Sequence, residues 1–132
     1  MDLFKKAASV DRKVVFSTLW IFAMFNYLYN DVFSLYFVPN IQKDALSTTS
    51  SQVLMFAFLM ETAIAMVLLS RFLKYGANRW LNVIFGIVHT ALVAWSVIGT
   101  TQQPFNIMFV SIEIACTLFI TGYALLWRKP EA

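Results

Sequence analysis

Four long apolar runs restrict the folds open to this chain of 132 residues. An α-helix needs about 20 apolar residues to cross a hydrocarbon layer roughly 30 Å thick. Strands with open edges are excluded at that depth, because their backbone groups would stay unpaired in lipid. The runs therefore predict an all-α integral membrane protein with four transmembrane helices. Their bounds are Val14–Phe37, Gln52–Ser70, Trp80–Ile98 and Asn106–Trp127.

The composition agrees with burial in a lipid bilayer. Hydrophobic residues make up 60% of the chain and charged residues only 13%, whereas soluble domains carry about 25% charged residues. A net charge of +3 would suit nucleic acid only if the basic side chains shared one face of a soluble fold. Here they lie between the apolar runs, so nucleic acid is excluded as a partner.

Short connections between the runs predict an up-down-up-down bundle, since each helix must pack against its neighbour in the sequence. The stretch Ser47–Ser51 offers several N-caps for the second helix. Gly76 is typical of a helix C-terminus followed by a reversal, and Pro104 is expected to break the chain before the fourth helix. A short N-terminal segment (1–13) and a tail (128–132) are predicted to flank a single transmembrane domain (14–127).

The ten Lys and Arg residues are divided unequally between the two predicted sides of the membrane. Only Lys43 lies in a connection on one side, and the other nine lie on the opposite side. Short loops rich in Lys and Arg stay in the cytoplasm. We therefore expect a multi-pass protein of the plasma (inner) membrane with both termini cytoplasmic. The nine residues are Lys5, Lys6, Arg12, Lys13, Arg71, Lys74, Arg79, Arg128 and Lys129.

Each apolar run contains one ionisable side chain: Asp31, Glu61, His89 and Glu113. Such groups cost at least about 2.5–3.5 kcal/mol at the bilayer centre, so they normally face the bundle interior or a wet cavity. We expect Glu61 and His89 to face the bundle axis. Together the four groups predict one polar site that spans the midplane and the outward half of the membrane.

Further polar residues surround this predicted site. Asn26, Tyr27 and Asn30 share a stripe with Asp31 on the first helix, at three- and four-residue spacing. In a ligand site these side chains contact the ligand, whereas in a structural role they form hydrogen bonds between helices. For His89 alone, the simplest interpretation is a core histidine bonded to a carboxylate.

No cofactor or metal ion is expected. Asp31, Glu61, His89 and Glu113 offer three oxygen ligands and one nitrogen ligand, a set that suits Mn, Fe or Zn. The Glu-x-x-His spacing of di-iron bundles is absent from the sequence, however. The single histidine excludes haem ligation by two histidines of one chain.

Three functions fit these features. The first is a pocket that binds or transports a small amphipathic or cationic ligand, with proton exchange at the buried carboxyl groups. The second is an intramembrane acid–base enzyme acting on a lipid-like substrate, and the third is an accessory subunit without chemistry of its own. The sequence has no nucleophile motif, phosphate loop or dinucleotide fingerprint, so no catalytic residue is assigned. A homo-oligomer is compatible with all three.

The layout resembles two families of small membrane proteins with four helices. One is the DoxX-like group, which is similar in length and helix count. The other is the EXPERA group, which includes sterol isomerases and the sigma-2 receptor. In that group an acidic residue near the end of the first helix precedes a proline, as Asp31 and Pro39 do here. Glu61 resembles the group's second-helix glutamate, and Val88–Thr90 resembles its third-helix histidine region.

The EXPERA resemblance implies a pocket for a sterol-like or amphipathic amine ligand. The first loop is shorter here than in that group. The stretch Ser17–Phe25, with Asn26 and Asp31, also resembles bacterial membrane proteins of this size that have no assigned function.

Overall fold

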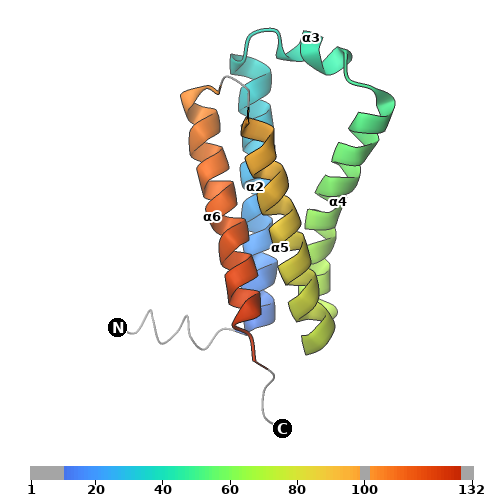
Figure 1. Cartoon of the computed structure of the whole chain (residues 1–132), viewed down its shortest axis with the longest axis vertical. Helices are drawn as coiled ribbons and strands as arrows, with labels where there is room; N and C mark the ends of the chain where they lie inside the picture. The colour runs from blue at the N-terminus through green and yellow to red at the C-terminus, as the bar shows by residue number, and fades with distance from the viewer. Residues whose placement is uncertain (1–10, 99–101, 129–132) are drawn as a thin grey trace.

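A computed structural model describes residues 11–98 and 102–128, and every regular element in these two ranges is a helix (Figure 1). The all-α prediction is therefore confirmed. Residues 1–10 and 129–132, which belong to the predicted N-terminal segment and tail, lie outside the described residues. The helices are α2 (Arg12–Phe37), α3 (Ile41–Leu46), α4 (Ser50–Phe72), α5 (Tyr75–Val97) and α6 (Pro104–Leu125).

Local chemistry sets the ends of these helices. The Thr49 hydroxyl accepts from the backbone N–H of Gln52 (3.3 Å), and the Gln52 side chain accepts from the backbone N–H of Thr49 (3.1 Å). This capping box lies within the predicted N-cap stretch. Pro104 is the first residue of α6, where its missing N–H is not needed. Gly76 lies in the first turn of α5 and ends no helix, because extended backbone at residues 73–74 makes the reversal.

The chain passes up and down through the four long helices, so that α2 contacts α4 and α6, and α5 contacts α4 and α6. The α5–α6 contact is the most extensive and the α4–α5 contact the least. Gly86 permits the close approach of α5 to α6, because a Cβ atom there would overlap Thr121 Oγ1. Figure 1 shows α4 leaning away from the other long helices toward the end where α3 lies.

The best-packed core lies in the half of the molecule where α2 begins. Phe16, Trp20, Met66 and Ile120 are fully buried there. The Phe16 ring also packs on Trp127, with ring centroids 5.5 Å apart. At the other end of the bundle the first half of α4 is exposed on all sides. Helix α4 is therefore packed into the core at one end of the bundle and exposed at the other.

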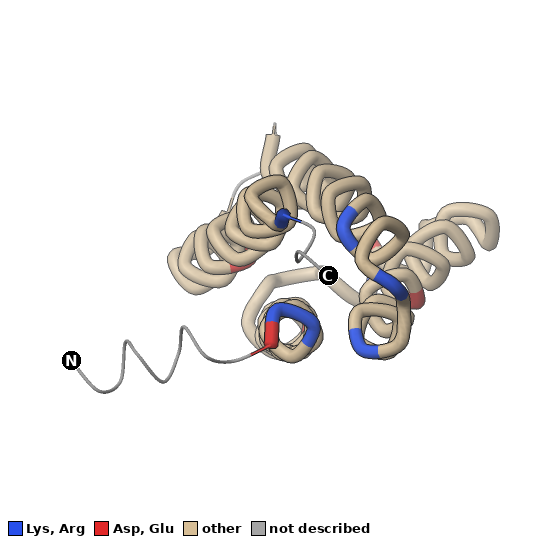
Figure 2. Tube along the Cα trace, turned by 90° about the horizontal axis from the view of Figure 1, so that it is seen from below, with Lys and Arg blue, Asp and Glu red and all other residues tan. Residues whose placement is uncertain are grey.

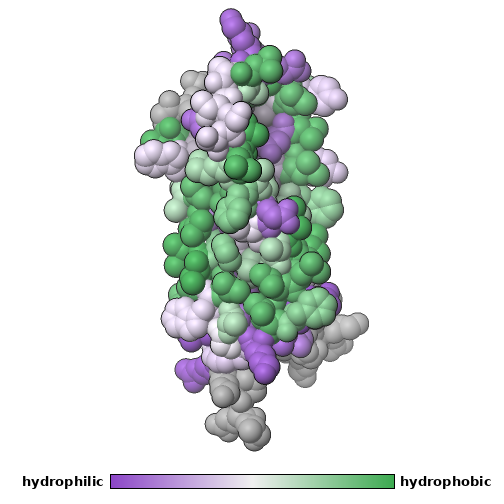
Figure 3. Space-filling model, turned by 90° about the vertical axis from the view of Figure 1, so that its right-hand side faces the viewer, coloured by the Kyte–Doolittle hydropathy of each residue, from purple (hydrophilic) through white to green (hydrophobic). Residues whose placement is uncertain are grey.

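The outer surface is apolar over most of its height. Figure 3 shows a hydrophobic belt with hydrophilic residues above and below it. Three helices, α4, α5 and α6, are long and apolar enough to cross a membrane. Helix α2 has 26 residues, about 39 Å at 1.5 Å per residue, but its polar stripe makes it less apolar than the other three.

Basic residues gather at one end of the bundle, as Figure 2 shows from below. We call this the basic end and the opposite one the α3 end. Arg12 begins α2, Arg79 lies near the start of α5 and Arg128 follows α6, all at the basic end, whereas Lys43 lies in α3. The unequal division of charge in the sequence is therefore also a division in space.

Candidate functional site

Near the basic end, buried polar side chains form a closed hydrogen-bond network. Trp20 Nε1 donates to Asn82 Oδ1 (2.8 Å), and Asn82 Nδ2 donates to Asn78 Oδ1 (2.7 Å). Asn78 Nδ2 in turn donates to the Ser70 carbonyl (2.7 Å). These four residues are fully buried and none of them is charged. Because their hydrogen-bonding groups have partners, the network connects α2, α4 and α5 without offering a binding site.

His89 lies beyond this network, fully buried between neighbouring helices. Its Nδ1 is 3.2 Å from Tyr27 Oη, and its Nε2 is 3.0 Å from Thr62 Oγ1. The Thr62 hydroxyl gives its one hydrogen to the Leu59 carbonyl (2.6 Å), so Nε2 donates to Thr62 and Nδ1 accepts from Tyr27. The Trp20 ring packs edge-on against the imidazole, with centroids 5.2 Å apart. Neutral His89 is thus fully hydrogen-bonded.

Two predictions, one about His89 and one about Glu61, are wrong. His89 bonds to two hydroxyl groups and not to a carboxylate. Glu61 does not face the bundle axis, because its side chain is exposed. The buried face of α4 contains Ala63 and Met66. At about 100° per residue, Glu61 lies roughly 200° around the helix from Ala63, on the opposite face.

A cavity of about 750 Å³ lies between the four long helices in the half of the bundle near the α3 end. We call it the main cavity. Its wall on one side is formed by α4, through Met55, Phe56, Leu59 and Met60. Figure 1 shows that α4 leans away from the other long helices. Apolar residues of α4 and α5 form much of its wall, and none of the described residues that line it is Lys or Arg. Its polar lining consists of Tyr27, Asn30, Asp31, His89, Ser96 and Glu113.

Glu113 is the most unusual of these lining residues. Its side chain is only 2% exposed, and among the described residues its Oε1 is the one buried side-chain nitrogen or oxygen without a hydrogen-bond partner. Asp31, on α2, lines the same cavity but is exposed. A buried ionised carboxylate without a partner costs several kcal/mol. The site therefore favours either a proton on Glu113 or a cation beside it.

Asparagine side chains close the bundle on one side of the main cavity. Asn106 Nδ2 donates to Asn30 Oδ1 (2.7 Å) and to Ser34 Oγ (3.0 Å), which connects α6 to α2. Asn26, by contrast, donates to the Phe22 carbonyl of its own helix (2.9 Å). Of the predicted stripe on α2, Asn30 and Tyr27 thus make contacts between helices, and Asn26 bonds within α2.

A second hollow of about 350 Å³ lies between α2 and α4 and adjoins the main cavity. We call it the side groove. It shares Tyr27, Asp31 and Met60 with the main cavity. Tyr27 and Asp31 are its only polar lining residues among those described. The remaining lining residues are Ile21, Met24, Phe25, Leu28 and Ile64. The side groove is thus mainly apolar, and its one acidic residue, Asp31, also lines the main cavity.

Comparison with protein families matches residues 1–132, the whole chain, to a family of unknown function, DUF6326. The chain belongs to the DUF6326 family. No curated protein and no solved structure matches it. The match supports neither the DoxX-like nor the EXPERA resemblance.

Several residues that organise this DUF6326 site were not among the predicted site residues. Trp20, Thr62 and Asn106 hold His89 and Asn30 in place through the ring contact and hydrogen bonds described above. The sequence does contain a signal for the network near the basic end, since Asn78 and Asn82 are four residues apart and share one face of α5. It contains none for the partners, which come from other helices.

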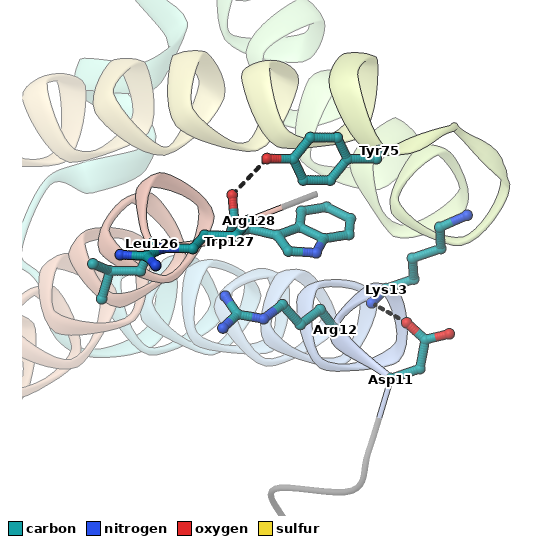
Figure 4. Close-up of a pocket in the computed structure, with 7 residues that line it drawn as sticks. All are labelled: Asp11, Arg12, Lys13, Tyr75, Leu126, Trp127 and Arg128. Carbon is teal, nitrogen blue, oxygen red and sulfur yellow. Dashed lines mark hydrogen bonds between the residues drawn. The ribbon is translucent and has the colours of Figure 1, made fainter. Parts of the chain in front are cut away.

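A third hollow, of about 740 Å³, lies at the basic end of the DUF6326 chain (Figure 4). The basic and aromatic side chains near it donate to carbonyl groups in the last turn of α6 and just after it. Arg12 Nη1 donates to the Tyr123 carbonyl (2.9 Å), Tyr75 Oη to the Trp127 carbonyl (2.7 Å), and Arg79 Nε to the Ala124 carbonyl (3.1 Å). Cations at a helix C-terminus stabilise it, so these contacts cap α6. The lining residues are Asp11, Arg12, Lys13, Tyr75, Leu126, Trp127 and Arg128.

A metal centre has no support in the described part of this DUF6326 chain, where no three His, Cys, Asp or Glu side chains are grouped to hold an ion. Cys116 is buried, and its thiol donates to the Leu19 carbonyl (3.3 Å). The described residues thus offer an apolar cavity lined by two carboxyl groups and by no Lys or Arg.

Proposed function

We propose that this chain is a multi-pass plasma membrane protein, with four spans and cytoplasmic termini, that binds or transports a small cationic amphiphile in the main cavity. Glu113 carries the proposal. Its carboxyl group is buried in the cavity wall, and one of its oxygens has no partner among the described residues. A ligand ammonium group supplies the donor that this oxygen lacks.

The charge of the lining residues supports a cationic ligand over an anionic one. Asp31 and Glu113 both line the cavity, and the described lining contains no Lys or Arg. Trp95 also lines it, and an aromatic face attracts an ammonium group within about 6 Å. A carboxylate or phosphate ligand would meet two acids of the same sign, and a desolvated like charge is strongly unfavourable.

The side groove supports an amphipathic ligand rather than a fully polar one. A ligand whose ammonium group lies near Asp31 can extend an apolar chain into the groove along Phe25 and Ile64. The groove lies between α2 and α4, whose outer faces are apolar. A ligand dissolved in the bilayer therefore has a direct path to the cavity.

Acid–base catalysis is less well supported than binding. General acid–base chemistry needs two groups free to exchange protons with one substrate. Glu113 meets that requirement, but both ring nitrogens of His89 are within hydrogen-bonding distance of hydroxyl groups of the protein. We therefore assign His89 a positioning role, in which it fixes Tyr27 at the cavity wall.

The experiment compares octylamine with octanol, two probes of equal chain length that differ in charge. Purified full-length protein in lipid nanodiscs is titrated with each probe by calorimetry. We expect binding of octylamine well above that of octanol, and Glu113→Gln should weaken octylamine binding by about 10- to 100-fold, since hydrogen bonds to charged groups contribute about 1.5–3 kcal/mol. Because a proton and an ammonium group compete for one carboxylate, the amine affinity should also rise with pH in the wild type and less so in the variant.

Glu61→Gln is the matched control, since it removes the same acid from a position outside both hollows. It should leave octylamine binding unchanged. Unchanged affinity in a folded Glu113→Gln protein, or equal binding of octanol, would contradict the proposal.

A further inference from the structure

Glu61 is an acid in an unusual place. It is the central residue of α4 (Ser50–Phe72), its side chain is exposed, and it lines none of the three hollows. The structure gives its carboxyl group no partner among the described residues. Figure 3 shows a hydrophilic spot within the apolar belt on the side of the molecule where α4 lies.

The residues around Glu61 make a face suited to another helix. Ala57 and Ala65 lie four residues before and after it, and small residues at this spacing allow helices in membranes to approach closely. Leu54 and Leu68 lie further along the same face and are 70% and 61% exposed. We call this set the Glu61 face. It lies away from Ala63 and Met66, which α4 buries within its own bundle.

A carboxyl group at the centre of a span requires a polar partner, because lipid tails offer neither donors nor acceptors. Within the described parts of the four apolar runs there is no Lys or Arg to serve as a complementary cation. A protonated carboxyl group, however, both donates and accepts hydrogen bonds. Glu61 is thus complementary to a copy of itself.

We propose that the Glu61 face joins two copies of this chain in the membrane, with their α4 helices side by side and the two Glu61 carboxyl groups hydrogen-bonded to each other. Two copies inserted in the same orientation present Glu61 at the same depth. A two-fold axis along the membrane normal then brings the same patch of each copy together, as in most symmetric dimers. The main cavity lies on the other side of α4, so the contact leaves it open.

Disulfide crosslinking in native membranes tests the contact directly. The chain has one cysteine, Cys116, so single cysteines are introduced into a Cys116→Ala background. Ala57→Cys and Ala65→Cys should give crosslinked dimers under mild oxidation. Leu118→Cys is the control, because Leu118 is an exposed residue of α6 (55% exposed) away from the Glu61 face, and it should stay monomeric.

Substitution of Glu61 itself tests the chemistry. Glu61→Leu should raise the dimer dissociation constant, measured by single-molecule photobleaching in bilayers, by roughly 3- to 30-fold, the effect of an interhelical hydrogen bond in a membrane. Glu61→Gln should restore most of the affinity, since an amide also donates and accepts. Equal crosslinking at positions 57 and 118, a wild-type protein that is monomeric in bilayers, or crosslinks to a different protein would overturn the proposal.

Discussion

The contacts of His89 with Tyr27 and Thr62 connect three helices at a single residue. Loss of one hydroxyl leaves a buried ring nitrogen unpaired. We expect Tyr27→Phe to lower the free energy of unfolding by about 0.6–2 kcal/mol, the usual range for hydrogen bonds between helices in membranes. Unfolding of the purified protein in mixed micelles measures this. Tyr29→Phe is the matched control, because Tyr29 is on the same helix but 51% exposed; equal effects of the two variants would contradict the role given to His89.

For single residues, the sequence predicted which side chains are buried better than it predicted their hydrogen-bond partners. Glu113 lies inside the bundle, as expected of an ionisable group in an apolar run, since it is buried. Glu61 was assigned to the wrong face because α4 is apolar all round, so that periodicity does not distinguish its lipid side from its buried side. The neighbouring Thr62 points inward instead and reaches His89. Which helix supplies the partner of a buried polar group depends on packing that a single sequence does not contain.

Among the helices, α5 and α6 form the closest pair, and Gly86 makes it possible. A Cβ atom at position 86 would overlap Thr121 Oγ1 and lie 3.3 Å from the Thr117 carbonyl oxygen. Gly86→Val therefore forces the Thr121 side chain or α6 to shift, which should weaken the nearby Thr90–Thr117 hydrogen bond (2.7 Å). We expect a destabilisation of about 1–3 kcal/mol, as for other overpacked cores.

Gly122→Val is the matched control for Gly86→Val, because a Cβ atom at Gly122 meets nothing within 4 Å. The two substitutions change helix propensity alike. Thermal unfolding followed by circular dichroism should give a clearly lower midpoint for Gly86→Val. Similar midpoints for the two variants would contradict the close contact.

The four long helices agree with the apolar runs to within a few residues, because each run is long enough to identify a helix. The exception is the start of α5, at Tyr75 rather than Trp80, where polar residues continue the helix beyond the apolar run. The short helix α3 and the lean of α4, which opens the main cavity, were not predictable. Helix α3 buries none of its residues, and hydropathy does not report how a helix tilts.

For the whole molecule, the decisive question is which way it lies in the membrane and whether α2 crosses it. Basic residues gather at one end of the bundle, and short basic loops remain in the cytoplasm. We therefore expect the basic end to face the cytoplasm and α3 to face outward.

Single cysteines at Asp11, Asp44 and Gly76, in the Cys116→Ala background, report the two sides when intact cells are treated with a membrane-impermeant maleimide. Asp44→Cys should react at once, whereas the other two should react only after the cells are permeabilised. Because Asp11 and Asp44 flank α2, opposite reactivity at these positions also establishes α2 as a span. Reaction of Gly76→Cys from outside would reverse the orientation, and equal reactivity at positions 11 and 44 would remove α2 from the set of spans.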